Sequence, residues 1–295
     1  MDAKEELWLA PLRGVTIRAF REVFAAALDE AGFAGAFAPF IPANPGIRVN
    51  DRMLADLMPG PNGGGARARL VPQVISRHSE AMRELLKGFK DRGFTRADLN
   101  AGCPFPMIVR RGRGSGLFKT PDVLEKLIEA GCDEMGPGNF SVKTRLGLDR
   151  PDELLKLMPI YNRYPLAALT VHARTGRQMY TGSCDWSAVG EVLAVSVNPV
   201  FLNGDLDVAG ASPLAGVAGR LVGRSFIRNL GLRADAGELL RRYVARSQAE
   251  LCGDHPVLGR MKELLSYWKE VSPRWRRLWP LVKIVRTVEE LRSLL

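Results

Sequence analysis

The sequence predicts an α/β protein that ends in a small all-helical domain. Short apolar segments that suit β-strands alternate with helical segments as far as residue 233, which is typical of a sheet of parallel strands. Beyond that point only helical apolar spacing remains. The chain has 295 residues, and a barrel of roughly 200–250 residues would leave a smaller appendage. We therefore expect two domains, at 1–233 and 234–295.

Composition and turn residues place the individual elements. Strand-like ranges are apolar and end at Gly, Pro or Asn turns; they are 7–10, 34–41, 70–75, 97–100, 140–145, 168–172, 198–205 and 220–224. Thr16 is predicted to cap a helix over 17–31, and Pro121 after Thr120 predicts another helix start. Further helices are expected at 79–91, 121–130, 151–164, 236–251, 256–271, 274–279 and 283–295. The Gly-rich loop at 59–65 lacks the Gly-Lys-Ser/Thr of a P-loop.

The most informative stretch follows the fourth predicted strand and reads LNAGCPFPMIVRRGRGSGLF. Cys103 stands directly after the strand, and the carboxyl ends of strands carry the active sites of α/β barrels. Most single cysteines are small buried hydrophobes. Here Pro104 and Pro106 stiffen the turn, Gly102 permits a close approach, and Asn100 offers an amide. These neighbours favour a functional role for Cys103.

Other predicted strands also carry polar groups near their ends. Gln73 lies within an apolar strand, where a buried amide needs a hydrogen-bond partner. Lys143 and Arg145 alternate to one side of a strand. If that side faces inward the two cations need an anion nearby, and if it faces outward they are solvated. His172 ends the sixth strand beside Arg174, which indicates polar chemistry at a barrel mouth, although a lone His is more often structural.

The composition favours a polyanionic partner and a cytoplasmic protein. The formal net charge is +10 and the pI about 9.8, and basic surface binds phosphate without reading sequence, although many basic proteins bind no nucleic acid. No run of 18 apolar residues predicts a membrane helix, and the first residues lack the apolar core of a signal peptide. The spacing of the cysteines predicts no metal site; they are Cys103, Cys132, Cys184 and Cys252.

Several motifs together resemble those of the tRNA-dihydrouridine synthases, which are flavin enzymes. They are Asn-x-Gly-Cys-Pro at 100–104, Gly-x-Gly-Ser-Gly at 112–116, Lys-x-Arg-Leu-Gly at 143–147 and His-x-Arg-Thr at 172–175. The resemblance runs from about Leu9 to Arg224. It implies a TIM (β/α)8 barrel that carries FMN, with Cys103 as the proton donor. It also implies tRNA as the substrate and NADPH as the electron source.

The resemblance further implies a set of cofactor contacts. In the family's opening motif Leu12 replaces the usual Met, a change that a backbone contact with the flavin tolerates. Gln73 would meet the isoalloxazine edge and Lys143 the pyrimidine ring. Ala218-Gly219 stands where the family has Asp-Gly, which predicts a local structural difference. The residues implied to hold FMN are Pro11, Leu12, Arg13, Gln73, Lys143, His172, Asn203, Gly204, Asp205, Gly223 and Arg224.

The RNA is expected to meet three groups of residues. Asn100, Arg145 and Arg174 would hold the target base or the flavin, and a basic loop would grip the backbone through Arg110, Arg111 and Arg113. Residues 234–295 carry 12 Lys and Arg against 8 Asp and Glu, a net charge of +4. Three of the arginines, Arg274, Arg276 and Arg277, are interleaved with tryptophans. This pattern suits an RNA backbone, because arginine supplies charge and tryptophan supplies a ring for stacking. The plain alternative is an amphipathic helix with its tryptophans inward.

Two other functions stay open at this point, and we expect a monomer in each case. One is a flavin barrel that reduces a small pyrimidine or enone and has no affinity for RNA. The other is a non-catalytic RNA-binding paralogue. That reading would require a damaged site, whereas Cys103, Lys143 and His172 are all present.

Overall fold

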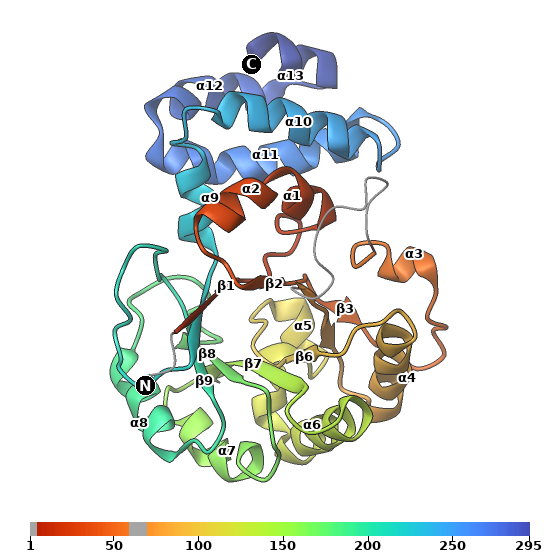
Figure 1. The fold of residues 1–295 in the computed structure, drawn as a ribbon, viewed down its shortest axis with the longest axis vertical. Helices are drawn as coiled ribbons and strands as arrows, with labels where there is room; N and C mark the ends of the chain where they lie inside the picture. The colour runs from red at the N-terminus through yellow and green to blue at the C-terminus, as the bar shows by residue number, and fades with distance from the viewer. Residues whose placement is uncertain (1–4, 59–69) are drawn as a thin grey trace.

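A computed structural model describes residues 5–58 and 70–295 of the chain. Ten strands pair in parallel, and helices cover the outside of the sheet (Figure 1). The strands are β1 (Glu6–Leu9), β2 (Gly35–Phe37), β3 (Ile41–Pro42), β4 (Leu70–Val71), β5 (Gln73–Ile75), β6 (Ala97–Asn100), β7 (Phe140–Gly147), β8 (Leu169–Thr175), β9 (Val200–Asn203) and β10 (Gly219–Val222). Each predicted strand is confirmed, and the loop predicted at 59–65 lies outside the described residues.

The parallel ladder closes on itself at Pro72. The strand order is β3-β5-β6-β7-β8-β9-β10-β1-β2-β4. β4 and β5 are two halves of one strand, because Pro72 between them has no N–H to donate. β4 pairs with β2, while β5 pairs with β6, so this strand joins the two ends of the sheet. β2 and β3 also divide one predicted strand, which leaves eight positions in a closed ring and confirms the predicted barrel.

The helices mostly follow the predicted pattern and differ at their ends. Around the barrel they are α1 (Arg18–Val23), α2 (Ala25–Glu30), α3 (Asp51–Leu54), α4 (Ser79–Lys90), α5 (Pro106–Arg110), α6 (Pro121–Met135), α7 (Glu153–Tyr161), α8 (Trp186–Val195) and α9 (Arg224–Leu230). The sequence pattern does not predict α3, α5, α8 or α9. Within residues 5–58 and 70–295, no helix combines the length and apolarity needed to cross a membrane.

The single capped helix predicted over 17–31 is wrong. Two short helices, α1 and α2, meet at Phe24 instead, and Ile17 occupies the cap position without a side-chain hydrogen bond. Thr16 is fully buried, and its hydroxyl accepts the N–H of Leu12 at 2.8 Å. The hydroxyl therefore closes the loop before the helix, and it is not available to the helix N-terminus.

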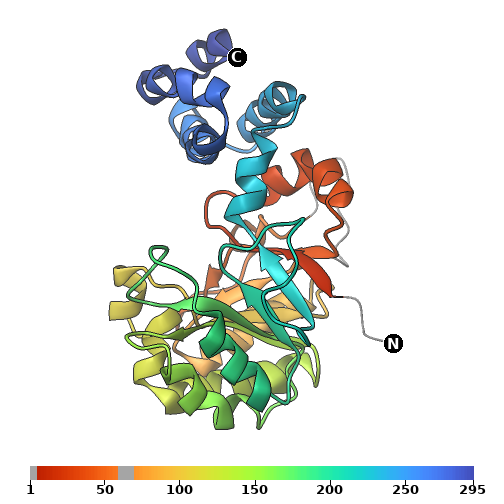
Figure 2. The ribbon, with the colours of Figure 1, turned by 90° about the vertical axis from the view of Figure 1, so that its left-hand side faces the viewer.

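A group of four helices packs beside the barrel mouth (Figure 2). They are α10 (Ala236–Gln248), α11 (Asp254–Val271), α12 (Pro273–Ile284) and α13 (Val288–Leu294), which confirms the predicted helical C-terminal region. Aromatic rings of α1 and its end, Phe20 and Phe24, contact Tyr243 of α10, and Phe24 also contacts Trp268 of α11. One hydrophobic core therefore runs from the barrel into the helices. The boundary at 233/234 remains a prediction.

An ion-pair cluster also joins the two regions. The carboxylate of Glu250, which follows α10, lies 2.7 Å from Arg18 of α1. It lies 2.9 Å from Arg246 of α10 and 3.0 Å from Arg260 of α11. The Glu250 side chain is only 13% exposed, so water screens these pairs little. Three helices thus share one acidic partner.

We predict that Glu250→Gln destabilises the protein by about 1–3 kcal/mol, because three guanidinium groups lose their charged acceptor in a poorly hydrated place. The measurement is the midpoint of thermal unfolding. Glu84→Gln is the matched control, since Glu84 is 66% exposed and pairs only with Lys87 on its own helix. Equal midpoints for the two variants would show that the cluster contributes nothing.

Candidate active site

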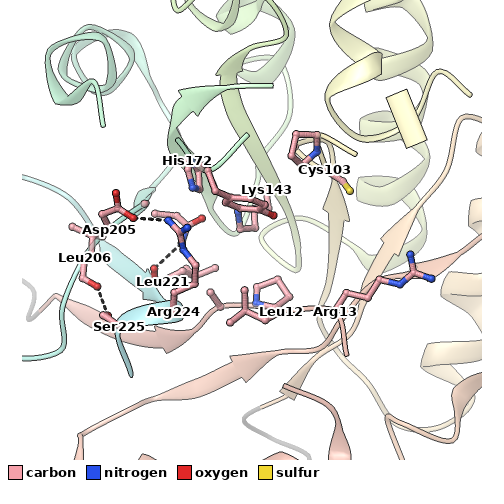
Figure 3. A pocket seen from close by; sticks show the side chains of 18 of the residues that line it. Leu12, Arg13, Cys103, Lys143, His172, Asp205, Leu206, Leu221, Arg224 and Ser225 are labelled. Atoms are coloured by element: carbon pink, nitrogen blue, oxygen red, sulfur yellow. Dashed lines mark hydrogen bonds and ion pairs between the residues drawn. The ribbon is translucent and has the colours of Figure 1, made fainter. Parts of the chain in front are cut away.

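A cavity of about 660 Å³ opens where the strands end. Its wall includes residues at the carboxyl ends of six strands or just beyond them: Ala10, Asn100, Arg145, His172, Asn203 and Gly223. Figure 3 shows Lys143, His172 and Arg224 converging, with Cys103 at one end and Asp205 at the other. This is the face of a parallel barrel at which active sites form, and the volume suits a cofactor or small ligand.

Most of the predicted site residues line this cavity. From the set expected to hold FMN, it gathers Pro11, Leu12, Arg13, Lys143, His172, Asn203, Gly204, Asp205, Gly223 and Arg224. Cys103, Asn100 and Arg145 also line it. Gln73 and Arg174 lie behind the lining, and the six predicted arginines of the loop and the tail lie elsewhere. Segments more than 200 residues apart in the chain therefore meet in one place.

Cys103 sits in a turn that is held from both sides. The Asn100 Oδ1 atom accepts the N–H groups of Gly102, at 3.2 Å, and of Cys103, at 2.8 Å. The Cys103 carbonyl in turn accepts the Ser115 N–H at 3.1 Å. Gly114 has φ +56°, and a Cβ there would lie 2.5 Å from that carbonyl oxygen, so only glycine fits. Burial raises the pKa of the Cys103 thiol above its usual value, which keeps it protonated at neutral pH.

A buried chain of hydrogen bonds continues behind this turn. The Asn100 Nδ2 atom donates to Gln73 Oε1 at 2.8 Å, and Gln73 Nε2 donates to Asp98 Oδ2 at 2.7 Å. The Ser141 hydroxyl donates to the other Asp98 oxygen at 2.6 Å. Burial raises the pKa of Asp98 to about 7. Both ends of the Gln73 amide are thus engaged by protein, and its predicted contact with a flavin remains a prediction. The sequence reasoning missed Asp98.

The two cations of β7 both face the cavity, as one of the two predicted alternatives required. The Lys143 ammonium makes no hydrogen bond to any described residue, and burial, with repulsion from Arg145, lowers its pKa to about 7. Arg145 is 2% exposed, and burial lowers its pKa to about 10. It donates to the carbonyl groups of Gly102, Thr175 and Met179 at 2.8, 2.9 and 2.7 Å. Arg145 therefore ties the Cys103 turn to the loop after β8.

His172 and Arg174 alternate along β8 and have different surroundings. His172 is buried, its Nδ1 atom has no hydrogen-bond partner in the described part of the chain, and burial holds its pKa well below the ordinary value. The ring is therefore neutral. Arg174 lies behind the cavity wall, where it donates to the Gly182 carbonyl at 2.6 Å and pairs with Asp205. The Nη1 atom of Arg174 is buried without a hydrogen-bond partner among the described residues, and the predicted contact of Arg174 with a base remains a prediction.

Asp205 anchors the end of the cavity farthest from Cys103. Its carboxylate bridges Arg174 and Arg224, the latter at 2.5 Å. The turn before it needs Gly204, which has φ +115°, because a Cβ there would lie 2.8 Å from the Cys184 sulfur. The ring of Tyr180 lies under two guanidinium groups, those of Arg145 at 5.2 Å and Arg224 at 5.0 Å. Tyr180 lies five residues beyond the His-x-Arg-Thr motif at 172–175, and no role was predicted for it from the sequence.

The helical region also contributes to the cavity. Four residues of α11 line it, namely Glu263, Ser266, Tyr267 and Glu270. Glu270 pairs with Arg228 at 2.5 Å, which moderates its charge. No local pattern in a helix far along the chain points to such a role, so sequence reasoning could not have found these residues.

The predicted arginines outside the cavity divide into exposed and buried groups. Arg110 and Arg111 are exposed beside the Cys103 turn. Arg113, which was predicted to contact RNA together with them, is only 8% exposed and donates to Asn44, and its contact with RNA remains a prediction. Glycines on both sides let the chain bend at this point, which turns its side chain inward.

On α12 the alternation of Arg and Trp has a structural origin. Trp275 is buried and donates to the Gly231 carbonyl at 3.0 Å, while Arg274, Arg276 and Arg277 are exposed. Arg276 also donates to the carbonyl groups of Lys269 and Glu270 at the end of α11. The geometry agrees with the alternative of an amphipathic helix, with Trp275 inward and the arginines outward, and contact of these arginines with RNA remains a prediction. Among the described residues, no cluster of His, Cys, Asp and Glu could hold a metal ion.

Comparison with known proteins agrees with this geometry. A family model described as dihydrouridine synthase matches residues 8–273. A probable tRNA-dihydrouridine synthase of Rhodobacter capsulatus is 31% identical over 73% of this chain and 66% of its own. tRNA-dihydrouridine synthase B of Vibrio cholerae is 28% identical over 69% of this chain and 61% of its own. The matched region thus spans less than two thirds of each of these relatives.

Solved structures support the fold alone. The old yellow enzyme homologue from Zymomonas mobilis has a TM-score of 0.57 at 15% identity, covering 86% of this chain and 92% of its own. Morphinone reductase has a TM-score of 0.55 at 12% identity, covering 76% and 83%. Both likenesses agree with the closed parallel barrel described above. Because the family model matches nearly the whole barrel and much of the helical region, the chain belongs to the dihydrouridine synthase family.

Proposed function

We propose that this protein reduces the C5=C6 bond of a uridine in tRNA to give 5,6-dihydrouridine, with FMN as cofactor and NADPH as electron source. The observation that carries the proposal is the buried Cys103 thiol at the wall of a cation-lined cavity. The relatives named above are tRNA-dihydrouridine synthases by name, which supports the choice of substrate. We expect the protein to act as a monomer in the cytoplasm.

The residues of the cavity fit FMN. A planar, polar and anionic ligand would meet the unbonded Lys143 ammonium, the unpartnered Nδ1 of His172 and the guanidinium of Arg224. Lys143 would stand by the pyrimidine ring, and Arg224 with the Asn203-Gly204 turn would hold the phosphate. Asp205 fixes the Arg224 guanidinium in place. When bound and reduced, FMN supplies a hydride for C6 of the uracil.

Cys103 then completes the reaction as a general acid. Its sulfur gives a proton to C5 of the uracil, and the raised pKa of the thiol keeps that proton available as the pH rises through neutrality. Lys143 would balance negative charge on the cofactor. Neutral His172 can orient the base or the cofactor without adding a further cation. The proton must be replaced from solvent after each turnover.

A uridine in folded RNA must leave its stack to reach this cavity. Arg110 and Arg111 lie exposed on the rim beside exposed Phe105 and Met107. Neither arginine forms an ion pair with any described residue, so both are available for phosphates. On the helical region, Arg274 and Arg277 are exposed and are the further phosphate contacts that we propose.

The purified protein is predicted to be yellow and to release FMN on denaturation. It should bind FMN more tightly than riboflavin, because Arg224 meets the phosphate. Arg224→Gln should reduce that preference by roughly 10-fold. Arg110→Gln, which lies outside the cavity, is the control. A colourless protein that fails to bind added FMN would remove the cofactor assignment.

Cys103→Ala should keep flavin binding and flavin reduction by NADPH near the parent values. Dihydrouridine formation in tRNA should fall by roughly 10²–10⁴-fold, because only the protonation step loses its acid. Cys252→Ala, at an exposed cysteine, is the control. Near-normal turnover by Cys103→Ala would identify another proton donor, and turnover of free uridine by the parent would favour a small-molecule reductase.

Replacing Arg274, Arg276 and Arg277 by Gln is predicted to weaken RNA binding and make its salt dependence shallower, by roughly 0.7–0.9 in slope per lost phosphate contact. Since Arg276 also caps α11, the double variant of Arg274 and Arg277 is the cleaner test. FMN content should not change. Arg96→Gln, at an exposed residue before β6 on the opposite side of the barrel, is the control. If the variant binds RNA like the parent at every salt concentration, the phosphate contacts lie instead at Arg110 and Arg111.

A further inference from the structure

We propose that Asp98 is a positioning residue, which holds the Cys103 turn in its working shape through the side chains of Gln73 and Asn100. This inference deepens the proposed function and rests on it. The three side chains come from β5 and β6, and they act on backbone N–H groups of the turn after β6. Asp98 and Gln73 are completely buried, so water cannot replace any bond of the series.

The hydrogen bonds run in one direction, from donors on Asn100 and Gln73 to the carboxylate of Asp98, which can only accept when ionised. One Asp98 oxygen accepts the Gln73 amide N–H at 2.7 Å. With the Gln73 nitrogen committed to the carboxylate, its oxygen faces Asn100 and accepts the Nδ2 donor at 2.8 Å. An amide group offers donors at one end and an acceptor at the other, so each bond fixes the orientation of the next.

The last bonds of the series act on the Cys103 turn. With its nitrogen turned to Gln73, Asn100 presents its oxygen to the N–H groups of Gly102 and Cys103. A reversed Asn100 would place its own donor against these two donors and leave both unsatisfied in a buried place. The orientation of Asn100, and with it the seat of the thiol, therefore depends on an acceptor at position 98.

Because of Ser141, residue 98 needs to offer an acceptor to Gln73 but does not need a negative charge. Its hydroxyl donates to Asp98 at 2.6 Å and lies 3.4 Å from the Ala97 carbonyl. If residue 98 offers a donor to Ser141, the hydroxyl can turn to that carbonyl. An asparagine at position 98 can then still accept from Gln73, whereas an alanine cannot.

The test measures alkylation of Cys103 by iodoacetamide, read by mass spectrometry against Cys132 in the same sample. Cys132 is equally buried, at 8% exposure, and lies on α6 outside the series, so it reports general loosening. Asp98→Ala should raise the Cys103-to-Cys132 ratio roughly 3- to 10-fold, the effect of losing one hydrogen bond that holds the turn closed. Asp98→Asn and Ser141→Ala should stay near the parent ratio.

Turnover supplies the second readout. In Asp98→Ala, kcat for dihydrouridine formation should fall roughly 10- to 100-fold while KM for RNA and FMN content stay near the parent values, because only the placement of the thiol changes. Asp98→Asn should restore most of kcat. An unchanged alkylation ratio in Asp98→Ala, or a ratio in Asp98→Asn as high as in Asp98→Ala, would overturn the proposal. The alkylation result decides the matter even if the parent forms no dihydrouridine, in which case the proposed function fails separately.

Discussion

The closure of the parallel strand ring is the constraint on which the site depends. Because all strands run in one direction, their carboxyl ends meet on a single rim, and residues from the ends of six strands reach the same cavity. Closure is made by the strand at 70–75, which pairs with β2 through one half and with β6 through the other. That arrangement sets Gln73 beside Asp98 and so brings the interior of the barrel into contact with the Cys103 turn.

Local patterns were sufficient for the strands and for much of the rim. Apolar runs that end in Gly, Pro or Asn located every strand of the described residues, and motif resemblance located many of the residues that line the cavity. What the local patterns did not predict depends on the three-dimensional partners of each side chain. Thr16 accepts the N–H of Leu12, four residues earlier, in place of a helix N–H, and Arg113 donates to Asn44, far away in the chain. The residues of α11 reach the cavity only because the helix packs against the barrel, and no local sequence pattern predicts that packing.

The buried arginines at the cavity donate hydrogen bonds to backbone carbonyl groups as well as to a carboxylate. Arg145 is held by three backbone carbonyls, and Arg174 by carbonyls of the loop after β8 together with Asp205. These two guanidinium groups are thus part of the framework. The Lys143 ammonium and the Nδ1 atom of His172 line the cavity without a hydrogen-bond partner among the described residues, and the Nη1 atom of Arg174 behind the wall is also unpartnered. In a site of low hydration, such groups interact strongly with a ligand.

The α11 wall has a thermodynamic consequence. A molecule that fills the cavity touches the barrel on one side and the helical region on the other, through residues such as Tyr267. Binding in the cavity and docking of the helices onto the barrel are then linked equilibria. Docking of the helices raises the affinity of the cavity for its ligand by some factor, and an occupied cavity favours docking by the same factor. The attachment of the helical region and the occupancy of the barrel are, in this sense, a single cooperative property of the chain.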